Sequence, residues 1–134
     1  MSGSLNSVTV SIADIKPVSS TGLETEVVLT LRYANENVIP IGLSGTVHKL
    51  YINGKYVGKA VSDNAVGLPP LKVVTDTVML RLDNIALMRE IINISNSKSA
   101  TYKLDSRLFI TSGEDKVSIK TSYTDSIDLQ AFAK

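Results

Sequence analysis

The sequence predicts a mainly β protein, an immunoglobulin- or fibronectin-III-like Greek-key β-sandwich of about seven strands with one short α-helix. Three observations support this fold class. Apolar and polar residues alternate along most of the chain, which is the pattern of strands with one buried face. Asn53-Gly54 lies between two such runs and favours a hairpin, because a type I′ turn needs positive φ at both central residues. Only the segment from Ile85 to Ile94 has helical spacing.

The N-terminal strands follow from this alternation. Val8, Val10 and Ile12 begin the first strand, and Pro17 is expected to end it because proline cannot donate a hydrogen bond to a ladder. In the stretch Leu23–Tyr33 the apolar residues again share one face. We therefore expect a second strand with one buried face and one face in water.

The next turn contains Asn35, Asn37 and Pro40. Asn side chains tolerate left-handed backbone and hydrogen-bond within their own turn, while proline fixes the backbone at the entry to the next segment. Together with Asn53 and Gly54 of the hairpin, these are the candidate site residues. We expect all five to have a structural role.

The remaining strands are placed by the same period of two. They are expected at Leu50–Ile52, Tyr56–Val61, Val74–Leu82, Tyr102–Ile110 and Val117–Tyr123, with a last short strand holding Ile127 and Leu129 and an edge or crossing at Leu68–Pro70.

The helix is expected between the strands that end at Leu82 and begin at Tyr102. Ile85, Met88 and Ile92 recur at intervals of three and four, and Asp83 or Asn84 can cap the first turn by accepting an orphan backbone N–H.

At 134 residues, the chain is long enough for one domain with a sizeable core. We expect residues 1–7 to be a disordered leader and residues 8–132 to form the domain. Because residues 1–7 are an arbitrary polar stretch, we expect a natural targeting segment before Val8, which would make the protein exported or membrane-tethered. The alternative is a cytoplasmic protein.

The motifs argue against catalysis and metal binding. There are no cysteines and His48 is the only histidine, which excludes thiol chemistry and a histidine-rich metal site. No Gly-x-Ser-x-Gly elbow accompanies His48, so a strand or surface role is favoured over a catalytic one. Glu114 and Asp115 lack the alternating oxygen ligands of a calcium loop. We expect no enzyme activity, no cofactor and no metal.

The charges nearly cancel. With 14 basic and 13 acidic residues, no strong field is expected to attract nucleic acid or an anionic membrane. Lys49, Lys55 and Lys59 surround the hairpin, where lysines on or near an edge strand discourage aggregation. The few aromatic residues are scattered and form no stacking platform. We expect no nucleic-acid partner and no small-molecule substrate, and the oligomeric state stays open.

Four short motifs occur along the chain at Val8–Pro17, Leu29–Asn37, Leu50–Lys55 and Ile127–Leu129. In this order and spacing, the chain resembles the water-stress and hypersensitive-response (WHy) domain of folded, type 2 late embryogenesis abundant proteins. Glu36 departs from the family, which usually has proline between the two asparagines.

The resemblance implies a non-catalytic, stress-protective protein that shields other proteins or membranes during desiccation, freezing or heat. Its partners would be client proteins or a membrane surface, bound non-specifically. The alternative is an immunoglobulin-like binding module that docks to a cell-envelope or surface partner, because β-sandwiches host many unrelated functions. An enzyme ranks below both.

Overall fold

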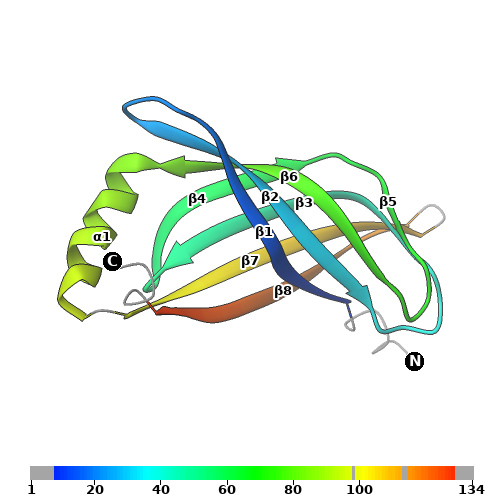
Figure 1. Ribbon diagram of the computed structural model, residues 1–134. Helices are drawn as coiled ribbons and strands as arrows, with labels where there is room; N and C mark the ends of the chain where they lie inside the picture. The colour runs from blue at the N-terminus through cyan, green and yellow to red at the C-terminus, as the bar shows by residue number, and fades with distance from the viewer. Residues whose placement is uncertain (1–7, 98, 113–114, 129–134) are drawn as a thin grey trace.

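The chain folds into antiparallel strands and one helix, as the computed structural model of residues 8–97, 99–112 and 115–128 shows (Figure 1). The elements are β1 (Val8–Ser20), β2 (Glu24–Asn35), β3 (Ile41–Ile52), β4 (Lys55–Ser62), β5 (Val66–Leu68), β6 (Val73–Asp83), α1 (Asn84–Ser97), β7 (Ser99–Ser112) and β8 (Asp115–Asp128).

All of these strands pair into one sheet in the order β1-β2-β6-β4-β3-β7-β8, with β5 paired to β3. The sheet is strongly curled, so that β1 and β2 cross over β3, β7 and β8 and enclose the core like half a barrel (Figure 1). The two ends of the order, β1 and β8, come into contact. A mainly β fold with one helix is confirmed, whereas the separate facing sheets of an immunoglobulin or fibronectin-III Greek-key sandwich are not confirmed.

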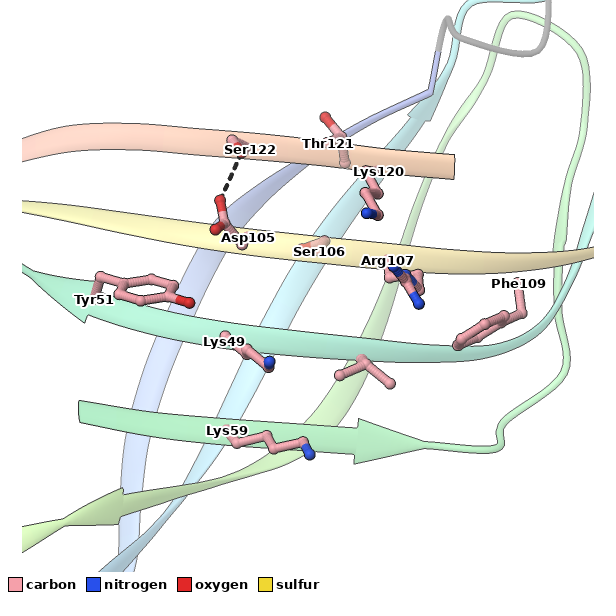
Figure 2. A pocket seen from close by; sticks show the side chains of 11 residues that line it. Lys49, Tyr51, Lys59, Asp105, Ser106, Arg107, Phe109, Lys120, Thr121 and Ser122 are labelled. Atoms are coloured by element: carbon pink, nitrogen blue, oxygen red, sulfur yellow. Dashed lines mark hydrogen bonds between the residues drawn. The ribbon is translucent and has the colours of Figure 1, made fainter. Parts of the chain in front are cut away.

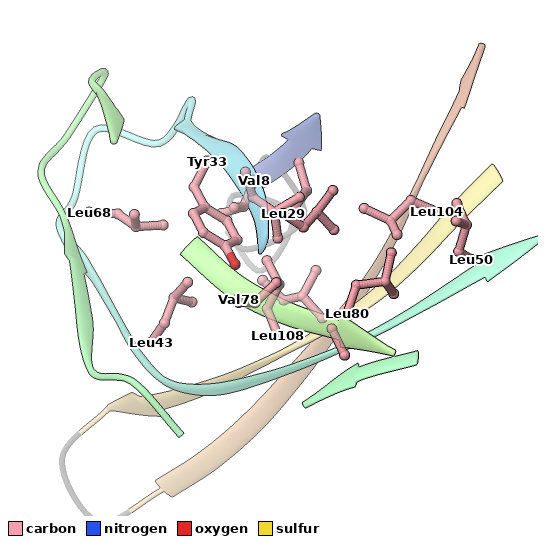
Figure 3. Close-up of a cluster of buried hydrophobic side chains, with 14 of the residues drawn as sticks. Val8, Leu29, Tyr33, Leu43, Leu50, Leu68, Val78, Leu80, Leu104 and Leu108 are labelled. Atoms are coloured by element: carbon pink, nitrogen blue, oxygen red, sulfur yellow. The ribbon is translucent and has the colours of Figure 1, made fainter. Parts of the chain in front are cut away.

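The core lies inside the curl and receives buried apolar side chains from every strand, most of them from β2, β3 and β7 (Figure 3). Each fully buried leucine contributes about 1.5–3 kcal/mol relative to an exposed one, so this face is the main source of stability. The largest fully buried apolar side chains are Tyr33, Leu29, Leu31, Leu68, Leu80, Leu104 and Leu108.

Strand β1 continues through Pro17, contrary to the prediction that this residue ends it. Pro17 pairs with Val27, and the register shifts just beyond it, between Pro17 and Ser19. Because β1 is at one end of the sheet order, a missing N–H can face outward without breaking a ladder bond. The prediction was wrong because it treated β1 as a strand with neighbours on both sides.

The Asn53-Gly54 hairpin is present where the sequence predicts it. Asn53 has φ of 50° and Gly54 has φ of 81°, and the pair Ile52–Lys55 closes the turn. Asn53 also ties the hairpin to β7, because its Oδ1 accepts a hydrogen bond from Thr101 N at 3.0 Å.

Helix α1 begins where the capping pattern indicates. Asp83 Oδ1 accepts hydrogen bonds from Ile85 N at 3.0 Å and from Ala86 N at 3.1 Å. Ala86 packs against the core, whereas Ile85 and Met88 are exposed. No helix among the described residues combines the length and the apolar character needed to cross a membrane.

The C-terminal strands differ from the prediction in one respect. Ile127 belongs to β8, which pairs continuously with β7 from Ser99–Asp128 to Ser112–Asp115, so within the described residues, which end at Asp128, no separate strand follows Tyr123. The predicted leader at residues 1–7 and the predicted strand residue Leu129 lie outside the described residues.

Candidate functional site

The pairing of β3 with β7 separates two groups of polar residues onto opposite faces of the sheet. His48 pairs with Ser106, and both side chains point into the core. Successive residues of a strand alternate between faces, so the neighbours Lys49 and Arg107 point outward. We call these the inner group and the outer group.

The inner group is a chain of hydrogen bonds through the core. His48 Nδ1 lies 2.7 Å from Ser106 Oγ, and His48 Nε2 lies 3.3 Å from the Tyr33 hydroxyl. A hydroxyl can donate or accept, so either neutral tautomer of the imidazole satisfies both partners. His48 is 0% exposed and Ser106 is 3% exposed.

Burial controls the protonation of this group. It lowers the pKa of His48 to about 4 because the charged imidazolium would lose its hydration. It also raises the pKa of Tyr33 to about 12. At neutral pH all three side chains are therefore uncharged. A serine and a histidine in contact can act as nucleophile and base, but this pair is enclosed by apolar side chains, which makes it a core contact of β3, β7 and β2.

The turn after β2 is organised around Asn35, which is 1% exposed. Its Nδ2 donates to the carbonyl oxygens of Ile39 at 3.0 Å, Leu68 at 3.0 Å and Pro69 at 3.2 Å. Its Oδ1 accepts from the backbone N of Asn37 at 2.9 Å. Asn35 thus joins the β2–β3 turn to the segment after β5.

The other predicted turn residues are placed around this centre. Asn37 is buried and donates through Nδ2 to Asn35 Oδ1 at 3.0 Å, while its own Oδ1 has no protein partner among the described residues. Pro40 is exposed and directly precedes β3. Asn53 and Gly54 form the separate hairpin turn between β3 and β4, so the five candidate residues do not converge on one site.

The outer group lines a shallow hollow of about 450 Å³ on the face of β4, β3, β7 and β8 (Figure 2). Four cations surround it, with Tyr51 and Phe109 toward its two ends. The cations are Lys49, Lys59, Arg107 and Lys120.

The register of the strands explains why these cations are close together. Lys49 is directly opposite Lys59, and Arg107 is directly opposite Lys120. Val47 is opposite Arg107, so Lys49 is its diagonal neighbour on the same face. Directly opposed residues have Cβ atoms about 5 Å apart and diagonal ones about 7–8 Å, so the four form one continuous cluster.

The one acidic side chain that lines the hollow does not neutralise the four cations. The hollow contains Asp105, which is directly opposite Lys49 across β3 and β7. Its Oδ1 accepts from Ser122 Oγ at 2.6 Å and its Oδ2 pairs with Lys103 Nζ at 3.6 Å. The other ion pair in the described part of the chain joins Arg81 to Glu26 at 3.7 Å. Neither pair includes a cation of the cluster.

The sequence interpretation missed this cluster. Lys49 and Lys59 were expected to protect a sheet edge, but β3 and β4 are interior strands of the sheet order, where no edge needs protection. Arg107 and Lys120 were not singled out at all. The outward position of each cation follows from strand alternation. Their proximity depends on the pairing order β4-β3-β7-β8, which the alternation of apolar and polar residues does not specify. A net charge near zero also conceals a local excess on one face.

No group of three or more metal-ligating side chains occurs among the residues that the structure describes.

The fold and the sequence have known relatives. A crystal structure of a protein from Archaeoglobus fulgidus is 24% identical with a TM-score of 0.60, covering 88% of this chain and 97% of that one. A solution structure of a protein from Arabidopsis thaliana is 14% identical with a TM-score of 0.67, covering 90% of this chain and 80% of that one. These likenesses show a shared fold. A comparison with curated proteins finds no match.

The family is shown by sequence. Residues 30–123 match the family model LEA_2, described as late embryogenesis abundant protein. This match begins in the middle of β2 and ends within β8, so it includes the Asn35 turn and the four cations of the outer group. The chain belongs to the LEA_2 family of late embryogenesis abundant proteins.

Proposed function

We propose that this protein is a non-catalytic stress protectant of the WHy type, which shields proteins or membranes during desiccation, freezing or heat. The observation that supports it most is the family match over residues 30–123. The WHy assignment in particular rests on the motifs Leu29–Asn37 and Leu50–Lys55, which form β2 with its turn and the start of the central hairpin.

The geometry is compatible with protection by a surface. The serine and histidine that could perform chemistry are buried in contact with each other, and the polar groups of the outer face are open to solvent. A folded domain of this kind acts by occupying the space between client molecules, so that their exposed apolar surfaces meet less often. Its effect then depends on its concentration relative to the client.

The test is the survival of a labile enzyme through drying or freezing. The enzyme is treated with this protein and, separately, with an equal mass of albumin as an inert control. We expect more residual activity with this protein than with albumin. Equal protection by the two would contradict the proposed function, because any added protein would then serve as well.

A second candidate function is a binding module that docks to one discrete surface partner. It is favoured by the concentration of cations on a single face, since a purely steric shield has no need of a charged cluster. Such a module retains one partner, and substitutions confined to Lys49, Lys59, Arg107 and Lys120 abolish the binding. If substitutions on other faces abolish the complex as completely as these four do, the binding module is excluded.

A further inference from the structure

We propose that the outer face of β4, β3, β7 and β8 is a contact surface for membranes that carry anionic lipid, with Lys49, Lys59, Arg107 and Lys120 binding headgroup phosphates. This inference deepens the proposed function, since it names one of the two shielded partners and the face that contacts it.

The first argument is the electrostatic repulsion within the cluster when the protein is unbound. Two pairs of like charges, Lys49–Lys59 and Arg107–Lys120, are directly opposed across strands. Opposed like charges destabilise a sheet. Asp105 of β7 is directly opposite Lys49 and offsets part of this repulsion, but none of the four cations takes part in the ion pairs of the described residues. One carboxylate cannot balance four cations, and a layer of anions against this face removes the repulsion that remains.

The second argument is the width of the cluster. Its members come from four adjacent strands, and three inter-strand spacings of about 4.8 Å separate the outermost two, so the cluster extends over roughly 14 Å. This width exceeds one phosphate group. An array of phosphates in a plane, as on a bilayer, matches cations distributed across a broad sheet face.

The third argument is the apolar surface between the charges. On the same face Val61 is 64% exposed and Phe109 is 38% exposed, and Val47, which is opposite Val61, lines the hollow. Figure 2 shows Phe109 at one end of the hollow and Tyr51 toward the other. Cations beside aromatic and aliphatic side chains suit the bilayer interface, where phosphates lie next to the hydrocarbon boundary. A dissolved acidic peptide would neutralise the cations but would not account for the exposed apolar side chains between them.

The strength expected of this contact is moderate. Each basic residue near an anionic bilayer strengthens binding about fivefold at low salt. Four of them together give peripheral association that salt reverses, because the Debye length falls from about 14 Å at 50 mM to about 4 Å at 500 mM.

The experiment measures partition of the purified protein onto vesicles by co-sedimentation. One set of vesicles is phosphatidylcholine alone, and the other also contains phosphatidylserine. We expect binding to the anionic vesicles only, weakened at least tenfold between about 50 and about 500 mM salt. Equal binding to both kinds of vesicle, or no binding to either at low salt, would overturn the proposal.

Two variants with the same change in net charge locate the contact. In the face variant glutamine replaces the four cations of the cluster, as Lys49→Gln, Lys59→Gln, Arg107→Gln and Lys120→Gln. In the control variant glutamine replaces four exposed cations elsewhere, as Lys16→Gln, Arg32→Gln, Lys55→Gln and Lys72→Gln. At about fivefold for each cation, we expect on the order of a 600-fold loss of partition in the face variant and less than a tenth of that loss in the control.

Equal losses of partition in the two variants would show that binding depends on net charge and not on the position of the cations on this face. Thermal melts accompany both, and a charge-conserving variant with Lys49→Arg, Lys59→Arg and Lys120→Arg is expected to bind like the wild type. If that variant is folded and fails to bind, headgroup attraction is not the cause. Binding of polyglutamate as tight as that of anionic vesicles would also overturn the proposal, in favour of an acidic protein partner.

This test separates the two proposals. Protection of a labile enzyme involves no lipid, so failure of that assay with intact vesicle binding removes the proposed protection of proteins and leaves the membrane contact standing. Protection of the enzyme without binding to anionic vesicles removes only the membrane contact.

Discussion

His48 is a neutral imidazole held between two hydroxyl groups in the core, and its burial depends on remaining neutral. Protonation would place a charge among apolar side chains of β2, β3 and β7, where water cannot solvate it. Protonation of His48 in acid is therefore expected to lower the stability of the whole fold.

The stability of the protein is expected to fall as the pH decreases from about 6.5 to about 4. The pKa of His48 is lowered from 6.5 to about 4 by burial, so in this window the unfolded chain binds the proton more readily than the folded chain. The loss in the free energy of unfolding reaches about 3 kcal/mol at pH 4 and levels off about one pH unit below. Denaturant unfolding at a series of pH values measures it.

The variant His48→Gln is the control for this prediction, because other groups also titrate in acid. It lacks the imidazole, so its stability is expected to depend less on pH than that of the wild type between pH 6.5 and 4. Identical pH dependence in the two proteins would show that His48 is not the group responsible.

Asn35 is expected to stabilise the fold more than Asn37 does. Three carbonyl oxygens accept from Asn35 Nδ2, and Asn35 Oδ1 accepts from Asn37 N, so Asn35→Ala removes several hydrogen bonds at a buried position and is expected to cost about 3 kcal/mol. Asn37→Ala removes one side-chain donor and is expected to cost about 1 kcal/mol. Thermal and denaturant melts of the two variants compare them, and a smaller loss for Asn35→Ala than for Asn37→Ala would refute this order.

The Asn35 turn shows how far a local pattern predicts a residue's place. The asparagine-rich sequence predicted the turn, because asparagine favours such backbone, and the turn is present. It did not predict that Asn35 would be its centre, because the acceptors Leu68 and Pro69 are more than thirty residues away and only the pairing of β5 with β3 brings them near.

At the scale of elements, β4 and β6 pair over Gly58–Ala60 only, and Gly58 is opposite Leu82. A Cβ at this position would lie 2.8 Å from the carbonyl oxygen of Arg81 and 2.8 Å from Leu82 Cδ2. The backbone of β6 would have to move to accept it. This contact closes the middle of the sheet between the half formed by β1, β2 and β6 and the half formed by β4, β3, β7 and β8.

Gly58→Ala is therefore expected to destabilise the protein by about 1–3 kcal/mol through overpacking against β6. Gly42→Ala is the matched control in β3, where a Cβ would have no neighbour within 4 Å, and it is expected to change stability by less than about 0.5 kcal/mol. The free energy of unfolding in denaturant measures both. Equal effects of the two substitutions would disprove the close approach of β4 and β6.

The elements that the sequence predicted well are those with local causes. The hairpin follows from Asn53-Gly54, and the start of α1 follows from the cap at Asp83. The errors concern strand order. Pro17 is tolerated because β1 is at the end of the sheet, and Lys49 and Lys59 are not edge lysines because β3 and β4 are interior. Alternation specifies which face a residue occupies, but not which strand lies beside it.

At the scale of the whole molecule, one curled sheet divides the polar chemistry into a closed inner cluster and an open outer face. Period-two alternation predicted a buried face for each strand, and this face forms the core. It could not distinguish two facing sheets from one sheet that curls onto itself, because both bury the same alternate residues. The family match identifies the chain as a late embryogenesis abundant protein.

The central claim is that the protein protects without turnover, and the dependence of protection on dose tests it most directly. A fixed amount of a labile enzyme is frozen and thawed with increasing amounts of this protein, and with the variant Ser106→Ala. We expect protection to rise in proportion to the molar ratio of protector to enzyme and to be the same for the variant where both are folded. Full protection by a small fraction of the enzyme's molar amount, lost with Ser106→Ala, would contradict the claim.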